Sequence, residues 1–393
     1  MHLFLSVGEP SGDLHAAKLL TELRRHLPDF RSSGLGGPQM EQAGCQVHYR
    51  LTDLAVMGLF AVLPLLGRFI GLVRQVGRWL DEDRPDAVLL VDFPGFNWWV
   101  ARAARRRGIP VIYMMPPQIW AWGGWRIHKM RRLVQLALCP LEFEQEWYTA
   151  RQVRARLIGH PFFDEVAQRP LDAEFLARQR DARAEGPVVA ILPGSRTQEV
   201  LANFPVQLEV MERLHQRFPQ ARFLIASFKD RQRELCEGML SARRDTLPVE
   251  FHVGKVGEIL ELADVCLMVS GSVSLEVLAR RVPAVVLYRV GWVNWIIGRM
   301  LIRCEYISLP NLIARRKIFP EYVLRTIDPV VVEQMTADLA GWLADPIACR
   351  RQQQEINNLA ATLASPGATQ RAAQILIEEL GWGEATATAR VAA

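Results

Sequence analysis

The sequence lacks the cysteine patterns of secreted and metal-binding proteins. It has only six cysteines among 393 residues, and they form no CxxC pair and no Cys/His cluster at zinc spacing. Isolated thiols of this kind are typical of a reduced, cytoplasmic protein. We therefore expect neither a disulfide framework nor a metal site.

Dense tracts of positive charge are also absent. The formal net charge is +5, with 47 basic and 42 acidic residues spread along the chain. This balance indicates a mild attraction to anions but not the basic face of a nucleic-acid-binding protein. We expect no nucleic-acid partner.

No hydrophobic run is long enough to cross a bilayer. The longest one, residues 54–73, is broken by Pro64 and Arg68, and the amino terminus has no secretory signal pattern. Residues 289–303 interleave tryptophan and isoleucine with arginines, a pattern that suits an interfacial helix on anionic lipid. An amphipathic core helix is the alternative. The sequence predicts peripheral membrane contact rather than a membrane span.

Strand and helix patterns alternate along the chain, which is too long for one compact core. Buried strands are predicted over residues 2–7 and 87–91, and the pattern starts afresh at Pro187 with the strand PVVAIL. Alternating strands and helices predict doubly wound parallel sheets. We expect two Rossmann-like domains whose strand-end loops face a central cleft.

The first loop, GEPSGDLH, follows the strand at residues 2–7 and opens a helix. Glu9 and Asp13 place two carboxylates there, where the loops of a parallel sheet bind ligands. The alternative is that Ser11 or Asp13 only caps the helix.

A third carboxylate, Asp92, ends the strand AVLLV and is followed by aromatic residues. Such a carboxylate has a raised pKa when it is buried, and it can then act as a general base on a hydroxyl. A structural aspartate bonded to backbone amides has the same sequence pattern. Asp92 is our first choice for the base, with Glu9 and Asp13 as competitors.

Two loops of the second half suit a nucleotide diphosphate. LPGSR places Gly194, Ser195 and Arg196 directly after a strand, where glycine admits a phosphate and arginine neutralises it; an ordinary turn is the alternative. SGSVSLE places small hydroxyl residues before a helix, with Glu276 suited to accept hydrogen bonds from a sugar or, alternatively, to cap the helix. The small residues of this second loop are Ser270, Gly271 and Ser272.

Gly34 to Pro38 are glycine-rich, but Gln39 replaces the third glycine of GxGxxG and no clear strand precedes the segment. A nicotinamide cofactor is therefore not indicated. The serine of PGSR lacks the GxSxG pattern of hydrolases. We expect no cofactor.

Taken in order, GEPSGDLHAA, GLGGPQM, VDFPGFN, IWAW, IGHP, LPGSRTQEV, SGSVSLE and YISLPNLIARR resemble the lipid-A-disaccharide synthase family over about residues 1 to 380. The resemblance implies a metal-free, inverting GT-B glycosyltransferase. It would transfer 2,3-diacylglucosamine from its UDP conjugate to the 6-hydroxyl of 2,3-diacylglucosamine 1-phosphate (lipid X), giving a β-1,6-linked disaccharide and UDP. The family's functional positions fall on Glu9, Asp13, Asp92, Arg196, Glu276 and Asn311.

The resemblance also implies a division of labour. Residues 1–170 would bind the acceptor lipid and residues 171–363 the UDP-sugar, and residues 364–383 would form a helix that returns to the first domain. The small and polar composition of residues 384–393 predicts a flexible tail. The apolar segment would contact acyl chains at the cytoplasmic face of the inner membrane. Its contact residues would be Val56, Met57, Leu59, Phe60, Leu63, Leu66 and Phe69.

The chain departs from the family pattern at Gly95, at residues 116–118 and at residues 314–317, all near the expected site. These positions are where the acceptor or its acyl pattern would differ. Alternative functions are a UDP-sugar transferase acting on another lipid, a UDP-N-acetylglucosamine 2-epimerase, and a catalytically silent homologue that binds lipid or nucleotide. An oligomer is compatible with the sequence.

Overall fold

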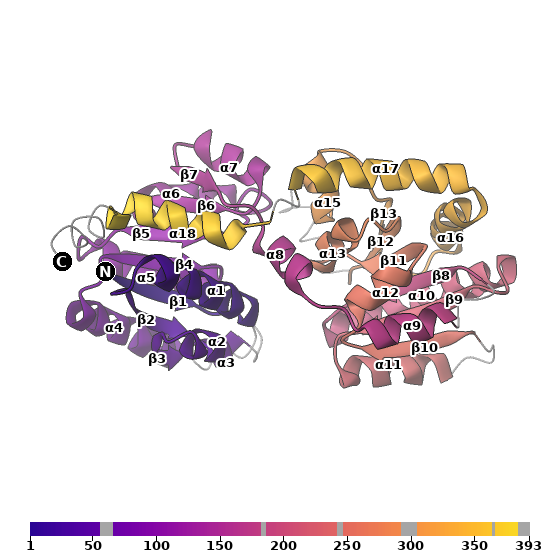
Figure 1. Cartoon of the computed structure of the whole chain (residues 1–393), viewed down its shortest axis with the longest axis horizontal. Helices are drawn as coiled ribbons and strands as arrows, with labels where there is room; N and C mark the ends of the chain where they lie inside the picture. The colour runs from indigo at the N-terminus through magenta and orange to yellow at the C-terminus, as the bar shows by residue number, and fades with distance from the viewer. Residues whose placement is uncertain (56–65, 182–185, 242–246, 292–304, 364–365, 384–393) are drawn as a thin grey trace. The chain divides into compact units, whose positions relative to one another are not determined.

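The computed structural model describes residues 1–55, 66–181, 186–241, 247–291, 305–363 and 366–383 (Figure 1). The chain folds into two compact units. The N-terminal unit comprises Met1–Asp164 and Pro366–Ala393, and the C-terminal unit comprises Glu165–Ser365. Helix α8 (Pro161–Gln168) lies at the division.

The N-terminal unit contains a seven-stranded sheet in the order β3-β2-β1-β4-β5-β6-β7, with every pair parallel. Its strands are β1 (His2–Val7), β2 (Arg31–Gly36), β3 (Gln46–Arg50), β4 (Ala87–Val91), β5 (Val111–Met114), β6 (Leu136–Cys139) and β7 (Ala155–Leu157). The helices are α1 (Pro10–His26), α2 (Pro38–Gln42), α3 (Thr52–Ala55), α4 (Leu66–Asp83), α5 (Pro94–Arg105), α6 (Ile127–Leu133), α7 (Glu142–Thr149) and α18 (Ala368–Glu379), with a 3-10 turn, η2 (Gly124–Arg126).

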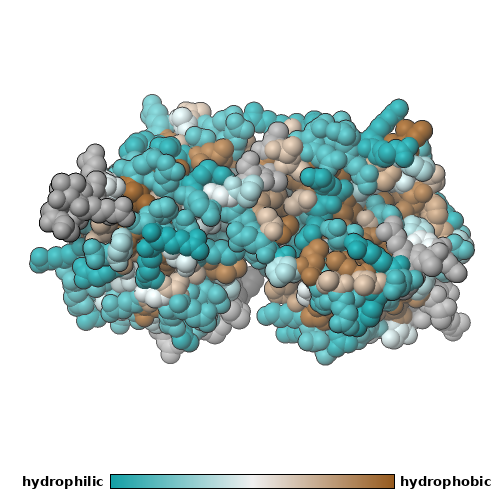
Figure 2. All heavy atoms as spheres, viewed as in Figure 1, coloured by the Kyte–Doolittle hydropathy of each residue, from teal (hydrophilic) through white to brown (hydrophobic). Residues whose placement is uncertain are grey.

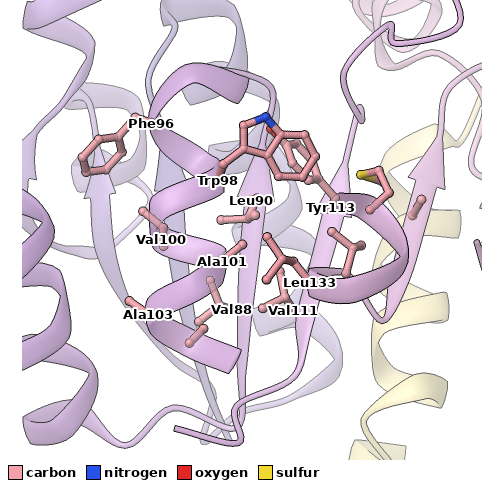
Figure 3. Packing of buried hydrophobic residues seen from close by; sticks show 14 of the residues in the cluster. Val88, Leu90, Phe96, Trp98, Val100, Ala101, Ala103, Val111, Tyr113 and Leu133 are labelled. Atoms are coloured by element: carbon pink, nitrogen blue, oxygen red, sulfur yellow. The ribbon is translucent and has the colours of Figure 1, made fainter. Parts of the chain in front are cut away.

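Helices cover both faces of this sheet, which explains its continuously hydrophobic strands. Successive side chains of β4 point to opposite faces. Val88 and Leu90 pack with residues of α4, α5 and α6, as Figure 3 shows for the α5 side, whereas Leu89 and Val91 pack with residues of α1 and α18. The sheet therefore separates two hydrophobic cores.

Helix α18 returns to the N-terminal unit and packs against α1. Ala372, Ala373 and Leu376 are fully buried in the core on that face. The carboxylate of Asp164 fixes the start of the helix by accepting hydrogen bonds from the backbone N–H groups of Gly367 (2.6 Å) and Thr369 (3.1 Å). Residues 384–393, the predicted tail, lie outside the described residues.

The C-terminal unit contains a six-stranded parallel sheet in the order β10-β9-β8-β11-β12-β13. Its strands are β8 (Val188–Leu192), β9 (Arg222–Ser227), β10 (Val249–Val253), β11 (Val265–Val269), β12 (Ala284–Arg289) and β13 (Glu321–Leu324). The helices are α9 (Ala173–Asp181), α10 (Thr197–Arg217), α11 (Asp230–Ser241), α12 (Val256–Leu262), α13 (Val273–Ala279), α15 (Leu309–Ala314), α16 (Pro329–Ala344) and α17 (Pro346–Leu363).

Both sheets reverse their strand order once. In the N-terminal unit the chain proceeds outward from β1 to β3 and then starts again at β4 on the other side of β1. In the C-terminal unit the same reversal separates β8 from β11. Ligands of such sheets bind at the carboxyl ends of the two strands that flank the reversal. The fold therefore marks one candidate site in each unit.

One expectation about the strands was wrong. We expected no clear strand before the glycine-rich segment, yet β2 runs through Arg31–Gly36 and includes its first glycines. The polar side chains of Ser32 and Ser33 concealed the strand, although both are buried in the structure.

Hydrophilic residues cover most of the visible face of each unit, and the hydrophobic residues form separate groups (Figure 2). None of the described helices combines the length and the apolar character needed to cross a bilayer.

Candidate active site

Two of the predicted carboxylates lie beside the strand-order reversal of the N-terminal unit. Glu9 follows β1 as the residue before α1, and Asp92 directly follows β4. Strands β1 and β4 are paired in the sheet, with Val7 opposite Val91. The structure therefore brings the two carboxylates to adjacent loops at the ligand-binding edge of the sheet.

The Asp92 loop has an unusual backbone conformation. Asp92 (φ 45°) and Phe93 (φ 47°) are consecutive left-handed residues, which is uncommon for residues other than glycine and occurs often at active sites. Buried side chains hold the turn through the Asp92 main-chain carbonyl, which accepts hydrogen bonds from Asn97 Nδ2 and the Tyr113 hydroxyl, both at 2.7 Å. Ser6 completes the support by donating to Asn97 Oδ1 at 2.7 Å.

The ring of Phe93 lies directly against the backbone of the first loop. A Cβ atom at Gly8 would lie 2.2 Å from the Phe93 ring, so only glycine fits there. This close approach joins the loop that carries Glu9 to the loop that carries Asp92.

Asp92 has the acid–base property expected of a general base. Burial and the negative charge of Glu9 raise its pKa from 3.8 to about 6, while a backbone hydrogen bond at Phe93 opposes the shift. A carboxylate with this pKa is ionised at neutral pH and still basic enough to accept a proton from a hydroxyl as the hydroxyl reacts.

Asp13 has a different environment. The residue is only 2% exposed, and its carboxylate accepts hydrogen bonds from the backbone N–H groups of Gly37 (2.9 Å), Gln39 (2.9 Å) and Met40 (3.2 Å). These are the free amides at the start of α2. Asp13 therefore holds the glycine-rich segment against α1 and does not cap its own helix.

In the C-terminal unit, both predicted nucleotide loops follow the strands that flank the reversal. The PGSR loop follows β8, and the SGS loop follows β11. Since β8 and β11 are paired, Gly194, Ser195 and Arg196 lie at the same sheet edge as Ser270, Gly271 and Ser272. The two loops are thus neighbours, as a site for one diphosphate requires.

Glu199, which the sequence analysis did not single out, organises the PGSR loop. Its Oε2 accepts hydrogen bonds from the backbone N–H groups of Ser195 and Arg196, both at 3.1 Å, and its Oε1 accepts one from Arg196 Nη1 at 3.1 Å. It lies three residues after Arg196 in the first turn of α10, the usual place of a capping glutamate. Gly194 is left-handed (φ 112°), which allows the chain to turn there.

The Arg196 side chain is 82% exposed. Among the residues that the structure describes, the side-chain partner of its guanidinium is Glu199. The guanidinium is therefore accessible to an anion at the loop.

Side-chain hydrogen bonds hold the SGS loop. The Ser270 hydroxyl donates to the Ile307 carbonyl (2.8 Å), and the Ser274 hydroxyl donates to the Gly271 carbonyl (2.7 Å). Glu276 is buried and pairs with Arg169. Ser272 is the N-cap residue of α13 and makes no capping hydrogen bond through its side chain, and the described partner of Glu276 is Arg169 rather than the loop backbone.

Asn311 is fully buried and belongs to a polar cluster beside the SGS loop. Its Nδ2 donates to the Phe319 carbonyl (2.8 Å) and to Glu321 Oε1 (2.7 Å), and its Oδ1 accepts from the N–H groups of Ile318 (2.7 Å) and Phe319 (2.8 Å). These bonds satisfy the whole amide. They favour a positioning role for Asn311 over direct contact with substrate.

Glu321 joins this cluster to the segment that supports Ser270. It accepts hydrogen bonds from the N–H groups of Ile307 and Ser308, each at 2.9 Å, and from Asn311. We expect Glu321→Gln to lower the free energy of unfolding by about 2 kcal/mol. The NH2 group of glutamine would replace one of the two accepting oxygens and would face N–H groups that can only donate. Urea denaturation followed by circular dichroism measures the change.

The exposed neighbour Glu305, whose only described bond is a 3.3 Å contact from Tyr306, provides the control. Glu305→Gln should change the free energy of unfolding by less than about 0.5 kcal/mol. Equal stability of the two variants would contradict the supporting role of Glu321.

The predicted acyl-chain contacts fall largely outside the described residues. Residues 56–65 and 292–304 are not described, and they include Val56, Met57, Leu59, Phe60 and Leu63. Leu66 and Phe69 lie in the first turn of α4. Among the residues that the structure describes, no group of three or more His, Cys, Asp or Glu side chains is placed to bind a metal ion.

Comparison with known proteins identifies the family. Residues 3–370 match the family model described as lipid-A-disaccharide synthetase. A lipid-A-disaccharide synthase of Anaeromyxobacter sp. (strain K) is 36% identical over 372 residues, which cover 95% of this chain and 96% of the relative. The enzyme of that name from Geobacter metallireducens is 32% identical and is covered to 97%. The chain belongs to the lipid-A-disaccharide synthetase family.

The fold of the chain is similar to that of solved structures outside this family. It resembles a UDP-GlcNAc 2-epimerase from Neisseria meningitidis with a TM-score of 0.61 and 14% identity, over 97% of this chain and 99% of the other. The glycosyltransferase of kitacinnamycin gives a TM-score of 0.62 and 17% identity, over 96% and 98% of the two chains. The predicted GT-B fold and the prediction of a glycosyltransferase of this family are both confirmed.

Proposed function

We propose that the protein condenses UDP-2,3-diacylglucosamine with lipid X, releasing UDP and the β-1,6-linked lipid A disaccharide 1-phosphate. The observation that carries the proposal is Asp92, a carboxylate with raised pKa at the strand-order reversal of a lipid-A-disaccharide synthetase family member. The epimerase alternative is disfavoured because the relatives that match nearly the whole chain at 32–37% identity are named synthases.

The N-terminal unit binds the acceptor in this proposal. Asp92 accepts the proton of the acceptor 6-hydroxyl, and Glu9 contacts the acceptor sugar while its charge keeps Asp92 basic. Asp13 acts through the segment at residues 37–40, which it holds by three backbone bonds. It is thus a positioning residue rather than a base.

The C-terminal unit binds UDP. The N–H groups and hydroxyls of the PGSR and SGS loops bind the diphosphate, Arg196 neutralises it, and Glu276 accepts hydrogen bonds from the ribose. The described residues include a competing partner for Glu276, the guanidinium of Arg169. Binding of ribose therefore requires Glu276 to share or exchange that partner.

The bonds of the transfer balance without a further reactant. The acceptor oxygen forms a bond to the anomeric carbon of the donor on the face opposite the leaving group, and the bond from that carbon to the β-phosphate oxygen breaks. The hydroxyl proton passes to Asp92, and the electron pair leaves with UDP. Arg196 and the loop N–H groups stabilise the negative charge as it develops.

The pH dependence of the reaction tests the pairing of Glu9 with Asp92. We expect kcat/KM to fall on the acid side of about pH 6, because protonation of Asp92 removes the base. In Glu9→Gln the acid limb should move to lower pH, since loss of the negative charge lowers the pKa of Asp92. The pH profile of kcat/KM measures the shift.

Asp29→Asn provides the control for this shift, because Asp29 is an exposed carboxylate outside the site. Its acid limb should coincide with that of the wild type. A Glu9→Gln limb that stays in place or moves to higher pH would contradict the electrostatic pairing.

Each of the two substrates is assigned to one part of the chain. We propose that residues 1–170 bind the acceptor lipid, that residues 171–363 bind the UDP-sugar, and that the segment at residues 54–73 contacts acyl chains at the cytoplasmic face of the inner membrane. Such peripheral contact suits an enzyme whose two substrates carry acyl chains.

Release of UDP provides a direct assay of the proposed function. The purified protein, in neutral detergent micelles with EDTA, should release UDP when both UDP-2,3-diacylglucosamine and lipid X are present. Each substrate alone should give no release. Release that is independent of lipid X would overturn the proposed acceptor.

A further inference from the structure

A strongly basic cavity lies among α4, α5 and α6 of the N-terminal unit. It has a volume of about 530 Å³. No carboxylate belongs to its lining, as far as the chain is described. Its principal lining residues are Trp99, Arg74, Arg102, Arg106, Arg107 and Arg132.

The cavity is separate from the candidate active site. The Asp92 loop lies at the start of α5, and the helix leads away from it. Trp99 and Arg102 lie on successive turns of α5, and Arg106 directly follows its last residue. Arg74 projects from α4 and Arg132 from α6. Three helices thus direct guanidinium groups to one place.

Little of this charge is neutralised within the unit. Arg107 pairs with Asp81 through two bonds of 2.8 Å, and Arg102 stacks over the ring of Trp99 at 5.0 Å. Among the described residues, no salt bridge involves Arg74, Arg106 or Arg132. Guanidinium groups that converge without counter-charge repel one another, and a bound phosphate relieves this repulsion with bidentate hydrogen bonds.

Exposed apolar side chains accompany the arginines. Trp99 is 49% exposed, and Ile70, one turn before Arg74 on α4, is 53% exposed. On η2, just before the helix that carries Arg132, Trp125 is 66% exposed, and the ammonium of Lys129 on α6 lies 5.6 Å from its ring. Exposed tryptophans beside arginine and lysine are typical of surfaces that lie at the boundary between lipid headgroups and acyl chains.

We propose that this cavity binds the phosphate headgroup of an anionic phospholipid and docks the N-terminal unit on the membrane surface. The arginines bind the phosphate, while Trp99 and Ile70 contact the adjoining acyl region. The proposal rests on the proposed function, which requires the enzyme to reach two acylated substrates at a membrane. The bound lipid is a component of the bilayer and neither of the two substrates.

Vesicle binding by the full chain tests the proposal. Phosphatidylcholine vesicles are compared with vesicles that also contain phosphatidylglycerol, using flotation of the wild type and of Arg102→Gln/Arg132→Gln. We expect the wild type to prefer the anionic vesicles and the double variant to bind them roughly 30-fold more weakly. The matched control Arg350→Gln/Arg351→Gln, which removes the same charge from exposed positions of α17, should bind as the wild type does.

A second variant keeps the test valid if the arginine substitutions disturb folding. Trp99→Ser leaves all five arginines in place and should also weaken binding to anionic vesicles; melting temperatures report whether each variant is folded. The proposal would be overturned if the cavity variants were folded and bound anionic vesicles as strongly as the control Arg350→Gln/Arg351→Gln. Binding of inorganic phosphate at the cavity without any binding of anionic vesicles would also overturn it.

The transferase assay keeps this proposal apart from the proposed function. Turnover by the wild type is measured in neutral detergent micelles, where no anionic phospholipid is present. Absence of turnover there, together with arginine-dependent vesicle binding, would overturn the proposed function and leave the membrane site supported. Turnover in the micelles, together with vesicle binding that does not depend on the cavity, would support the proposed function and overturn the proposed membrane site.

Discussion

Replacing Asp92 by asparagine is expected to reduce kcat about 10²- to 10⁴-fold, the usual contribution of a general base. Asparagine keeps the shape of the side chain but cannot accept the proton of the acceptor hydroxyl. The variant should fold, because the bonds from Asn97 and Tyr113 reach the main-chain carbonyl of residue 92 rather than its carboxylate. Asparagine also tolerates the left-handed backbone (φ 45°) better than most residues. Initial rates of UDP release measure the loss.

Binding of UDP provides the internal control for Asp92→Asn. The proposed UDP loops belong to the C-terminal unit, so the variant should bind UDP with the affinity of the wild type. A folded Asp92→Asn variant with unchanged turnover would exclude Asp92 as the base. The assignment would then pass to Glu9, because Asp13 is occupied by three backbone amides.

Replacing Arg196 by alanine should have the second largest effect, a fall of about 10²-fold in kcat/KM. Its exposed guanidinium is the cation of the PGSR loop in this proposal, and it stabilises the charge on UDP as the sugar leaves. The loop itself should persist, since Glu199 still accepts hydrogen bonds from the backbone N–H groups of residues 195 and 196. Steady-state kinetics with the UDP donor measures the change.

Two matched variants separate charge from geometry at this loop. Arg196→Lys retains the charge but loses the two-point geometry of the guanidinium, so its kcat/KM should lie between the values of the wild type and Arg196→Ala. Arg231→Ala removes an exposed arginine of α11 in the same unit and should leave the kinetics unchanged. Wild-type UDP affinity and turnover in Arg196→Ala would remove this residue from the UDP site.

The sequence allowed the placement of the candidate site because strand ends are visible in a single sequence. The buried run at residues 87–91 predicted that Asp92 ends a strand. The hydrophobic runs before the PGSR and SGS loops likewise predicted that each loop follows a strand. Parallel sheets gather such ends at one edge. The strand order itself, with β1 beside β4 and β8 beside β11, required the structure.

The contacts of several predicted site residues could not be read from the sequence, because their partners are distant along the chain. Asp13 bonds to residues 24 to 27 positions later, and Glu276 pairs with Arg169, 107 positions earlier. The left-handed turn at Asp92 depends on Ser6, through Asn97, and on Tyr113. The sequence analysis did not single out Glu199, although a glutamate three residues after an N-cap position is a local capping signal.

Product analysis tests the central claim most directly. The purified protein is incubated with UDP-2,3-diacylglucosamine and lipid X in neutral detergent micelles containing EDTA, and the lipid product is identified by mass spectrometry and by its glycosidic linkage. We predict a tetraacylated, β-1,6-linked disaccharide 1-phosphate in an amount equal to the UDP released. Formation of a UDP-linked 2-epimer, or UDP release without any disaccharide, would contradict the account.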